Sequence, residues 1–112
     1  MTLQQRLKSF HNAVSQLSIG GKKVKHYFHQ RMSAPYVIWA EDRAGSYYDA
    51  DNRKGEYTAH CTLDYFTKVE YDPVFDEIEQ MFNELFGSGW RWSSTQYEDG
   101  TGLIHHEWEF WL

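Results

Sequence analysis

The sequence predicts an α+β fold in which two helices pack on one face of a mainly antiparallel sheet, in the order α-β-β-β-α-β-β. Two segments have apolar residues at the spacing of an amphipathic helix, and the segments between and after them are rich in β-branched and aromatic residues. With 112 residues the chain is long enough for one modest core. Because no repeat or linker interrupts this order, residues 1–112 are expected to form a single two-layer domain.

The first helix is predicted over residues 3–17. Thr2 and Gln5 have the spacing of a capping box, in which each side chain accepts a hydrogen bond from the other residue's backbone amide. Gly20 and Gly21 allow the positive φ that commonly ends a helix. Apolar positions recur every three or four residues and define one buried stripe, made of Leu3, Leu7, Phe10, Val14 and Leu17.

Three strands are predicted between the two helices. Residues 22–30 form the first, although their pattern is neither cleanly alternating nor helical. Pro35 biases the residue before it toward extended structure, and residues 36–40 then combine β-branched and aromatic side chains in a buried strand. Residues 55–68 alternate, with a core face made of Tyr57, Ala59, Cys61, Leu63 and Tyr65. The polar stretch 49–55 is predicted to be a loop between the second and the third of these strands.

The second helix starts at Asp72 and Pro73, which suit the N-cap and the first turn, and ends at Gly87. Its buried stripe consists of Val74, Ile78, Met81, Phe82 and Leu85. A β-hairpin follows, with strands at 90–97 and 103–112 around the Asp-Gly turn of residues 98–102. One face of the last strand carries Ile104, His106, Trp108, Phe110 and Leu112, and the other carries Leu103, His105, Glu107, Glu109 and Trp111.

Charge and composition restrict the classes of function. A formal charge of −5 and a pI of about 5.6 argue against a protein whose main task is to cover a phosphate backbone. The single cysteine, Cys61, has no partner for an internal disulfide. We find neither a signal peptide nor an apolar run of membrane-spanning length, so the chain is expected to be soluble and intracellular, with no membrane partner.

Three pairs of metal-ligating residues occur, namely His26 with His29, His60 with Cys61, and His105 with His106. On a strand the members of each pair point to opposite faces, so these pairs do not predict a metal site. The stretch Asp49–Asn52 offers carboxylate and amide oxygens but lacks the glycine and the glutamate of a calcium-binding loop. A turn in which Asp and Asn bind local amides is the better interpretation of this stretch.

Catalytic machinery is not predicted either. Cys61 lies on the core face of its strand, while the neighbouring His60 faces the other way and is not placed to act as its base. The chain has no Gly-x-Ser-x-Gly elbow and no glycine-rich phosphate loop after a strand. The sequence therefore predicts a protein that is not an enzyme and has no cofactor, metal or catalytic residues.

Basic residues form two small clusters, one made of Lys22, Lys23, Lys25 and Arg31 and the other of Arg53 and Lys54. Solvated loop ends are the first interpretation, and the lining of a channel that passes DNA is the second. Several tyrosines lie near these charges, including Tyr27, Tyr36, Tyr47 and Tyr48. Because aromatic residues are enriched where proteins dock, they are candidates for interface anchors.

The order of several short motifs resembles the small tail-completion proteins of siphophages and prophages, which are also known as tail terminator, head-tail joining or minor capsid proteins. The motifs are Ala34-Pro35-Tyr36-Val37-Ile38-Trp39, Tyr47-Tyr48 with Ala50-Asp51-Asn52, Leu63-Asp64-Tyr65-Phe66-Thr67-Lys68, the helix 72–85, and Trp108-Glu109-Phe110. The resemblance covers about residues 33–112. Asp64 is an insertion relative to the family pattern, and the approach to the helix is shorter.

This resemblance implies a virion structural protein that forms a homo-oligomeric ring, typically a hexamer, at the head-proximal end of the tail. Its partners would be further copies of itself, the tail tube protein and the head connector or completion protein. DNA would pass through the lumen without sequence-specific binding. The protein would be found in the virion and, during assembly, in the host cytoplasm.

A ring subunit needs surfaces that contact its neighbours, and the tyrosine-rich and acidic stretch suits that role. The predicted interface residues are Tyr36, Tyr47, Tyr48, Asp49, Asp51, Asn52, Arg53 and Lys54. The alternative function is a small soluble bacterial module without catalytic activity, whose sheet face or hairpin grips a protein ligand.

Overall fold

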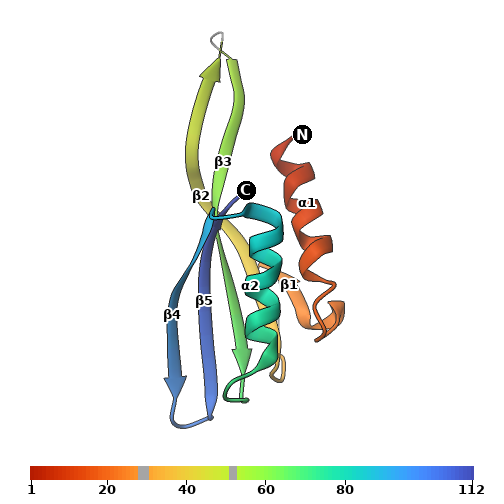
Figure 1. The fold of residues 1–112 in the computed structure, drawn as a ribbon, viewed down its shortest axis with the longest axis vertical. Coiled ribbons are helices and arrows are strands. Elements are labelled where there is room, and N and C mark those ends of the chain that lie inside the picture. The colour runs from red at the N-terminus through yellow and green to blue at the C-terminus, as the bar shows by residue number, and fades with distance from the viewer. Residues whose placement is uncertain (28–30, 51–52) are drawn as a thin grey trace.

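The computed structural model of the protein describes residues 1–27, 31–50 and 53–112, with side chains throughout except those of residues 46–56. Figure 1 shows two helices lying on the same side of a long, twisted sheet. In chain order the elements are α1 (Leu3–Val14), the 3₁₀ helix η1 (Gly21–Lys23), β1 (Val24–His26), β2 (Tyr36–Ala50), β3 (Arg53–Thr67), α2 (Pro73–Phe86), β4 (Trp90–Glu98) and β5 (Leu103–Trp111).

The sheet has five strands in the order β1-β2-β3-β5-β4. β1 pairs with β2 in parallel, and every other pairing is antiparallel. The predicted fold, two helices on one face of a mainly antiparallel sheet, is therefore confirmed. None of the helices in the described part of the chain is long and apolar enough to cross a membrane.

Helix α1 begins as predicted and ends earlier. The Thr2 amide donates to Gln5 Oε1 at 2.8 Å, and the Gln5 amide donates to Thr2 Oγ1 at 3.2 Å, so the capping box is present. The helix stops at Val14 rather than at residue 17, and the Ser15 hydroxyl donates to the carbonyl of His11 at its end. Leu17 is nonetheless buried, because the turns after the helix return it to the core.

The predicted first strand, residues 22–30, is mostly wrong in extent. Only Val24–His26 forms a strand, because the chain first makes the η1 turn, and residues 28–30 lie outside the described residues. β1 is an edge strand whose three residues pair with Val37–Trp39 of β2. Its short pairing explains why no clear alternation is visible in the sequence.

The hairpin of β2 and β3 is the largest departure from prediction. β2 continues ten residues past the predicted strand end, and Asp49, Ala50, Arg53 and Lys54 belong to strands rather than to a loop. The register places Tyr47 opposite Tyr57 and Asp49 opposite Lys54, with irregularities at three points along β2. Two strands can pair through their backbones without an alternation of apolar side chains. The polar composition of residues 49–55 therefore gave a wrong prediction of a loop.

The core lies between the helices and the sheet, and Phe10 of α1 is at its centre. Its ring centroid is 4.5 Å from that of Phe110 and 4.8 Å from that of Trp39, and it also stacks on Phe82 of α2. Most of the predicted helical stripes and strand faces are buried. Two residues predicted to be buried are exposed instead: Leu85 at the end of α2, with 46% of its surface exposed, and Tyr57 of β3, with 36% exposed. Tyr57 lies beyond the last residue of β3 that pairs with β5, so the sheet body does not cover it.

Helix α2 is anchored by its N-cap. Asp72 accepts hydrogen bonds from the Val74 amide at 2.9 Å and from the hydroxyls of Tyr65 and Thr67, each at 2.6 Å. Gly87, at φ +60°, closes the helix as predicted. One carboxylate thus links the end of β3 to the start of α2.

Candidate functional site

A two-stranded ribbon projects from the body of the protein (Figure 1). β5 pairs with β3 only from His60 onward, with one further pair of backbone hydrogen bonds between Ala59 and Leu112. β1 pairs with β2 only at its start. Within the described residues, positions 44–58 therefore have no third strand beside them, and we call this segment the arm. It helps make the molecule 53 Å long and only 24 Å across.

The base of the arm is held tightly. Arg6 of α1 donates to the carbonyl of Tyr57 at 2.7 Å and to the carbonyl of Met1 at 2.9 Å. A Cβ atom on Gly45 would lie 2.6 Å from Thr58 Oγ1 and 2.8 Å from the ring of Trp111. The absence of a side chain at Gly45 thus lets the arm approach the end of β5 closely.

The predicted interface residues fall at two ends of one hairpin. Tyr36 starts β2 and stacks half-buried on Phe66, with ring centroids 4.6 Å apart. The backbones of Tyr47, Tyr48, Asp49, Arg53 and Lys54 form part of β2 and β3 at the far end of the arm, and their side chains are outside the described part of the structure. Asp51 and Asn52 lie outside the described residues. The structure does not bring Tyr36 together with the tip.

The face of the sheet opposite the helices is not covered by a second layer in the described structure (Figure 1). Its central strands, β3 and β5, present alternating polar side chains on this side. These residues are His60, Thr62 and Asp64 on β3, and His105, Glu107 and Glu109 on β5. The residues form two neighbouring clusters, each with a histidine and carboxylates.

The first cluster is built around His60, of which only 3% is exposed. His60 Nδ1 lies 2.5 Å from Asp42 Oδ1, and Thr62 donates to the other oxygen of Asp42 at 2.9 Å. His60 Nε2 is 3.3 Å from Glu109 Oε1, but this nitrogen makes no hydrogen bond with the described residues. Arg91 donates to Glu109 at 2.5 Å and lowers the pKa of that carboxyl. Arg91 therefore supplies a positive charge next to the Glu109 carboxylate of this cluster.

The second cluster consists of Asp64, His105 and Glu107. His105 Nε2 lies 2.6 Å from Asp64 Oδ1, and the Ser93 hydroxyl donates to Glu107 Oε2 at 2.7 Å. The ring of Phe66 stacks on His105, with centroids 4.3 Å apart. The hydrogen bond with Asp64 raises the pKa of His105, against the lowering effect of burial.

The paired ligands considered from sequence lie apart. Cys61 is fully buried on the helix side of β3, whereas His60 bonds Asp42 on the other side. Burial raises the pKa of the Cys61 thiol to about 12, so it carries almost no thiolate at neutral pH. His106 packs against Phe75, away from the cluster of its neighbour His105. These separations confirm the predicted strand alternation.

The remaining histidines contribute to packing at the edge of the sheet. His26 stacks on Trp39 with centroids 3.9 Å apart and lies 2.8 Å from Glu41 Oε1. Trp39 in turn donates to His11 Nδ1 at 3.1 Å. His29 lies outside the described residues, so the structure does not test its predicted separation from His26.

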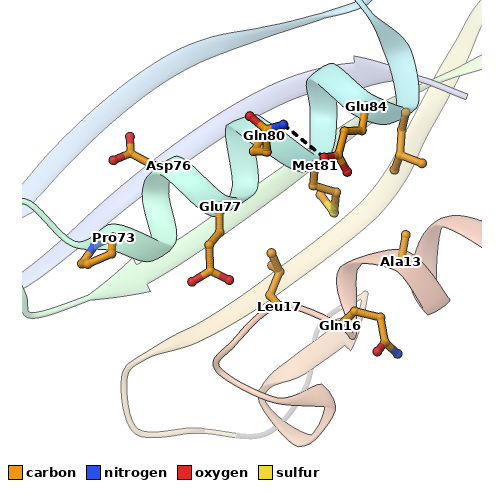
Figure 2. Close-up of a pocket in the computed structure, with 10 residues that line it drawn as sticks. Ala13, Gln16, Leu17, Pro73, Asp76, Glu77, Gln80, Met81 and Glu84 are labelled. Atoms are coloured by element: carbon orange, nitrogen blue, oxygen red, sulfur yellow. Dashed lines mark hydrogen bonds between the residues drawn. The ribbon is translucent and has the colours of Figure 1, made fainter.

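A shallow groove of about 580 Å³ runs between the two helices (Figure 2). Leu17 and Met81 point into it, and its rim carries the acidic side chains of Asp76, Glu77 and Glu84. Glu77 accepts hydrogen bonds from the Ser18 amide and hydroxyl and so fixes one wall. Its lining residues include no serine, threonine, cysteine, lysine or histidine.

No family model matches the chain, and no curated protein matches it. The function is therefore inferred from the chain itself, including the arm and the uncovered face of the sheet.

Sequence reasoning found the individual residues of the second cluster but not the cluster itself. The alternation along the last strand already placed His105 and Glu107 on one face. Asp64 joins them only through the β3–β5 register, in which it stands opposite Glu107. Pairing between distant strands is the information that the sequence pattern lacks.

Proposed function

We propose that the protein is a virion structural subunit of a long-tailed phage or prophage, a tail terminator or head-tail joining protein that forms a ring at the head-proximal end of the tail. The projecting arm is the observation that carries this proposal. The motif order in residues 33–112 supplies the family, and the confirmed α+β fold agrees with it.

An isolated two-stranded ribbon is only marginally stable in water, because it has no third strand or packed layer to support it. In the described residues of the arm, 44–50 and 53–58, the two strands pair with each other and with no third strand. The outer edges of such a ribbon can accept another chain. Contact with another chain would bury these edges and order the ribbon. The arm is thus built for contact with a neighbour rather than for the stability of its own subunit.

An arm that reaches the body of the next subunit makes a heterologous contact, in which two different surfaces meet. Such contacts produce a closed ring when the rotation between subunits is right. We propose a ring of identical subunits, a hexamer, with the tail tube protein on one axial side and the head connector on the other. DNA would pass through its lumen without sequence readout.

Of the basic residues, Lys23 has a structural role. Its ammonium group donates to the carbonyl of Ser33 at 2.6 Å and so ties the η1 turn to the segment before β2. This contact favours the interpretation of the first basic cluster as a loop end. This contact accounts for the position of the Lys23 side chain without a role in lining a DNA channel.

Replacing both Tyr47 and Tyr48 by serine is expected to leave the domain folded but to prevent ring formation. These residues lie far along the arm, where β2 pairs only with β3. Mass photometry and negative-stain microscopy of the purified chain measure the assembly, and circular dichroism measures the fold. We expect rings for the natural sequence and monomers for the variant.

The matched control replaces Tyr71 and Tyr97 by serine. Both are exposed tyrosines outside the arm, at 92% and 63% exposure, so this variant is expected to assemble normally. Rings that persist in the Tyr47/Tyr48 variant would refute the role of the arm. Loss of the fold would show that the two tyrosines are core residues, and a chain that stays monomeric would favour the binding-module alternative.

A further inference from the structure

The second polar cluster on the uncovered sheet face has the composition and placement of a metal site, independently of the function proposed above. Asp64 and Glu107 are direct partners in the β3–β5 ladder, and His105 precedes Glu107 by two residues on the same face. The ligand atoms of the three side chains all lie within 4.8 Å of one another. All three side chains are half-buried.

No lysine or arginine among the described residues balances the charges of this cluster. Carboxylates directly opposite each other on adjacent strands repel and destabilise a sheet unless a cation lies between them. Among the described residues, neither Asp64 nor Glu107 forms an ion pair with a lysine or arginine. By contrast Glu109, the next acidic residue on β5, is paired with Arg91. The imidazole of His105 pairs with Asp64 at 2.6 Å.

The donor set matches the preferences of divalent transition metals. One imidazole nitrogen and two carboxylate oxygens suit Zn²⁺ and similar ions, and three protein ligands leave a position open toward solvent. With metal–ligand bonds of about 2.0–2.2 Å, two ligand atoms on a tetrahedral ion lie about 3.3 Å apart. The observed spacing of up to 4.8 Å therefore needs only small side-chain rotations.

Neighbouring groups already orient the ligands. The Ser93 hydroxyl holds one oxygen of Glu107 at 2.7 Å, which leaves the other oxygen for an ion. The Phe66 ring restrains the plane of the His105 imidazole from one side. Such supporting contacts reduce the ordering cost of binding and tune the ligands.

We propose that Asp64, His105 and Glu107 bind a divalent transition-metal ion, with Zn²⁺ as the representative ion. The site lies on rigid, paired strands, so it is formed before the ion arrives. The sequence predicted no metal site because the members of each ligand pair, His26 with His29, His60 with Cys61 and His105 with His106, are expected on opposite faces of a strand. The structure instead brings together residues of β3 and β5, which are far apart in the sequence but adjacent in the sheet.

Protons compete with the metal at this site. His105 binds an ion only when its nitrogen is unprotonated, and the carboxylates that face it, Asp64, Glu107 and Glu98, favour its protonated form. Affinity is therefore expected to increase with pH, because protons compete with the ion for this nitrogen and for the carboxylate oxygens.

The test is calorimetric titration of ZnCl₂ into the full chain without an affinity tag. We expect saturable binding of one ion per chain, weakened at least about tenfold in Asp64→Asn and in Glu107→Gln. Both variants keep the size of the side chain and remove one charged ligand. Glu98→Gln removes a charge near His105 without removing a ligand, so it is expected to bind Zn²⁺ no more weakly than the natural sequence does.

A second readout does not depend on the folding of any variant. In the natural sequence, Zn²⁺ is expected to shift the ring signals of His105 in the NMR spectrum more than those of His26 or His60. Absence of saturable binding at millimolar ZnCl₂ would overturn the proposal. The proposal would also be overturned if Asp64→Asn and Glu107→Gln bound Zn²⁺ as tightly as the natural sequence does. Larger Zn²⁺-induced shifts at another histidine than at His105 would overturn it too.

Discussion

Phe10→Ala is expected to lower the free energy of unfolding by about 4 kcal/mol, which is the largest effect that we predict for a single substitution. Phe10 is 2% exposed and contacts aromatic rings from α2, β2 and β5. Its removal leaves a cavity where the two layers of the fold meet. Because domains of this size are stabilised by only about 5–15 kcal/mol, the variant is expected to be partly unfolded at moderate temperature.

Two further variants make this prediction specific. Phe10→Leu keeps most of the volume and is expected to cost about 1 kcal/mol. Leu85→Ala, at a 46% exposed position of the other helix, is expected to change stability by about 0.5 kcal/mol. Urea unfolding followed by circular dichroism measures all three. A small effect of Phe10→Ala would contradict the position of α1 against the sheet.

Asp72→Ala is expected to lower the free energy of unfolding by about 3 kcal/mol. The substitution removes the N-cap of α2, which typically contributes about 1 kcal/mol. It also leaves the hydroxyls of Tyr65 and Thr67 without their acceptor in a largely buried position. An exposed acidic residue of the same helix, Glu84, is the control, and Glu84→Ala is expected to have little effect.

The contribution of Asp72 also depends on pH. Burial raises the pKa of this carboxyl, but hydrogen bonds from Thr67, Tyr65 and the Val74 amide outweigh burial and lower the pKa below its ordinary value. The native state thus holds its proton less tightly than the unfolded chain does. The stabilisation is complete above the unfolded pKa and is lost as the pH falls through the folded pKa.

Unfolding of the natural sequence and of Asp72→Asn at several pH values measures this dependence. The stability difference between them is expected to be constant near neutral pH and to shrink below about pH 4, where the unfolded carboxyl protonates. A difference that persists unchanged in acid would show that the charge of Asp72 is not what stabilises the native state.

Local signals in the sequence predict much of this fold. The capping box at Thr2, the N-cap at Asp72 and the closing Gly87 each mark a helix end through a short-range hydrogen bond or a backbone preference. Alternation along β3 and β5 identifies the core faces, since a packed layer covers only one side. Each of these features depends on residues that are close together in the sequence, so it can be recognised from the sequence alone.

Other features depend on contacts between distant segments. The extension of β2 to Ala50 follows from pairing with β3, and polar composition gave no sign of it. The early end of α1 at Val14 and the exposure of Leu85 are likewise set by packing rather than by periodicity. Of the candidate metal ligands, His105 and Glu107 share a predicted face, whereas Asp64 joins them through register.

We propose that this protein completes a phage tail, and the most direct test is electron microscopy of a lysate from an induced lysogen whose prophage lacks the gene. We predict defective particles beside filled, unattached heads. Tails of excess or ragged length would identify a terminator, and uniform tails that fail to join heads would identify a joining protein. Normal, infectious particles in the deletion lysate would contradict the claim.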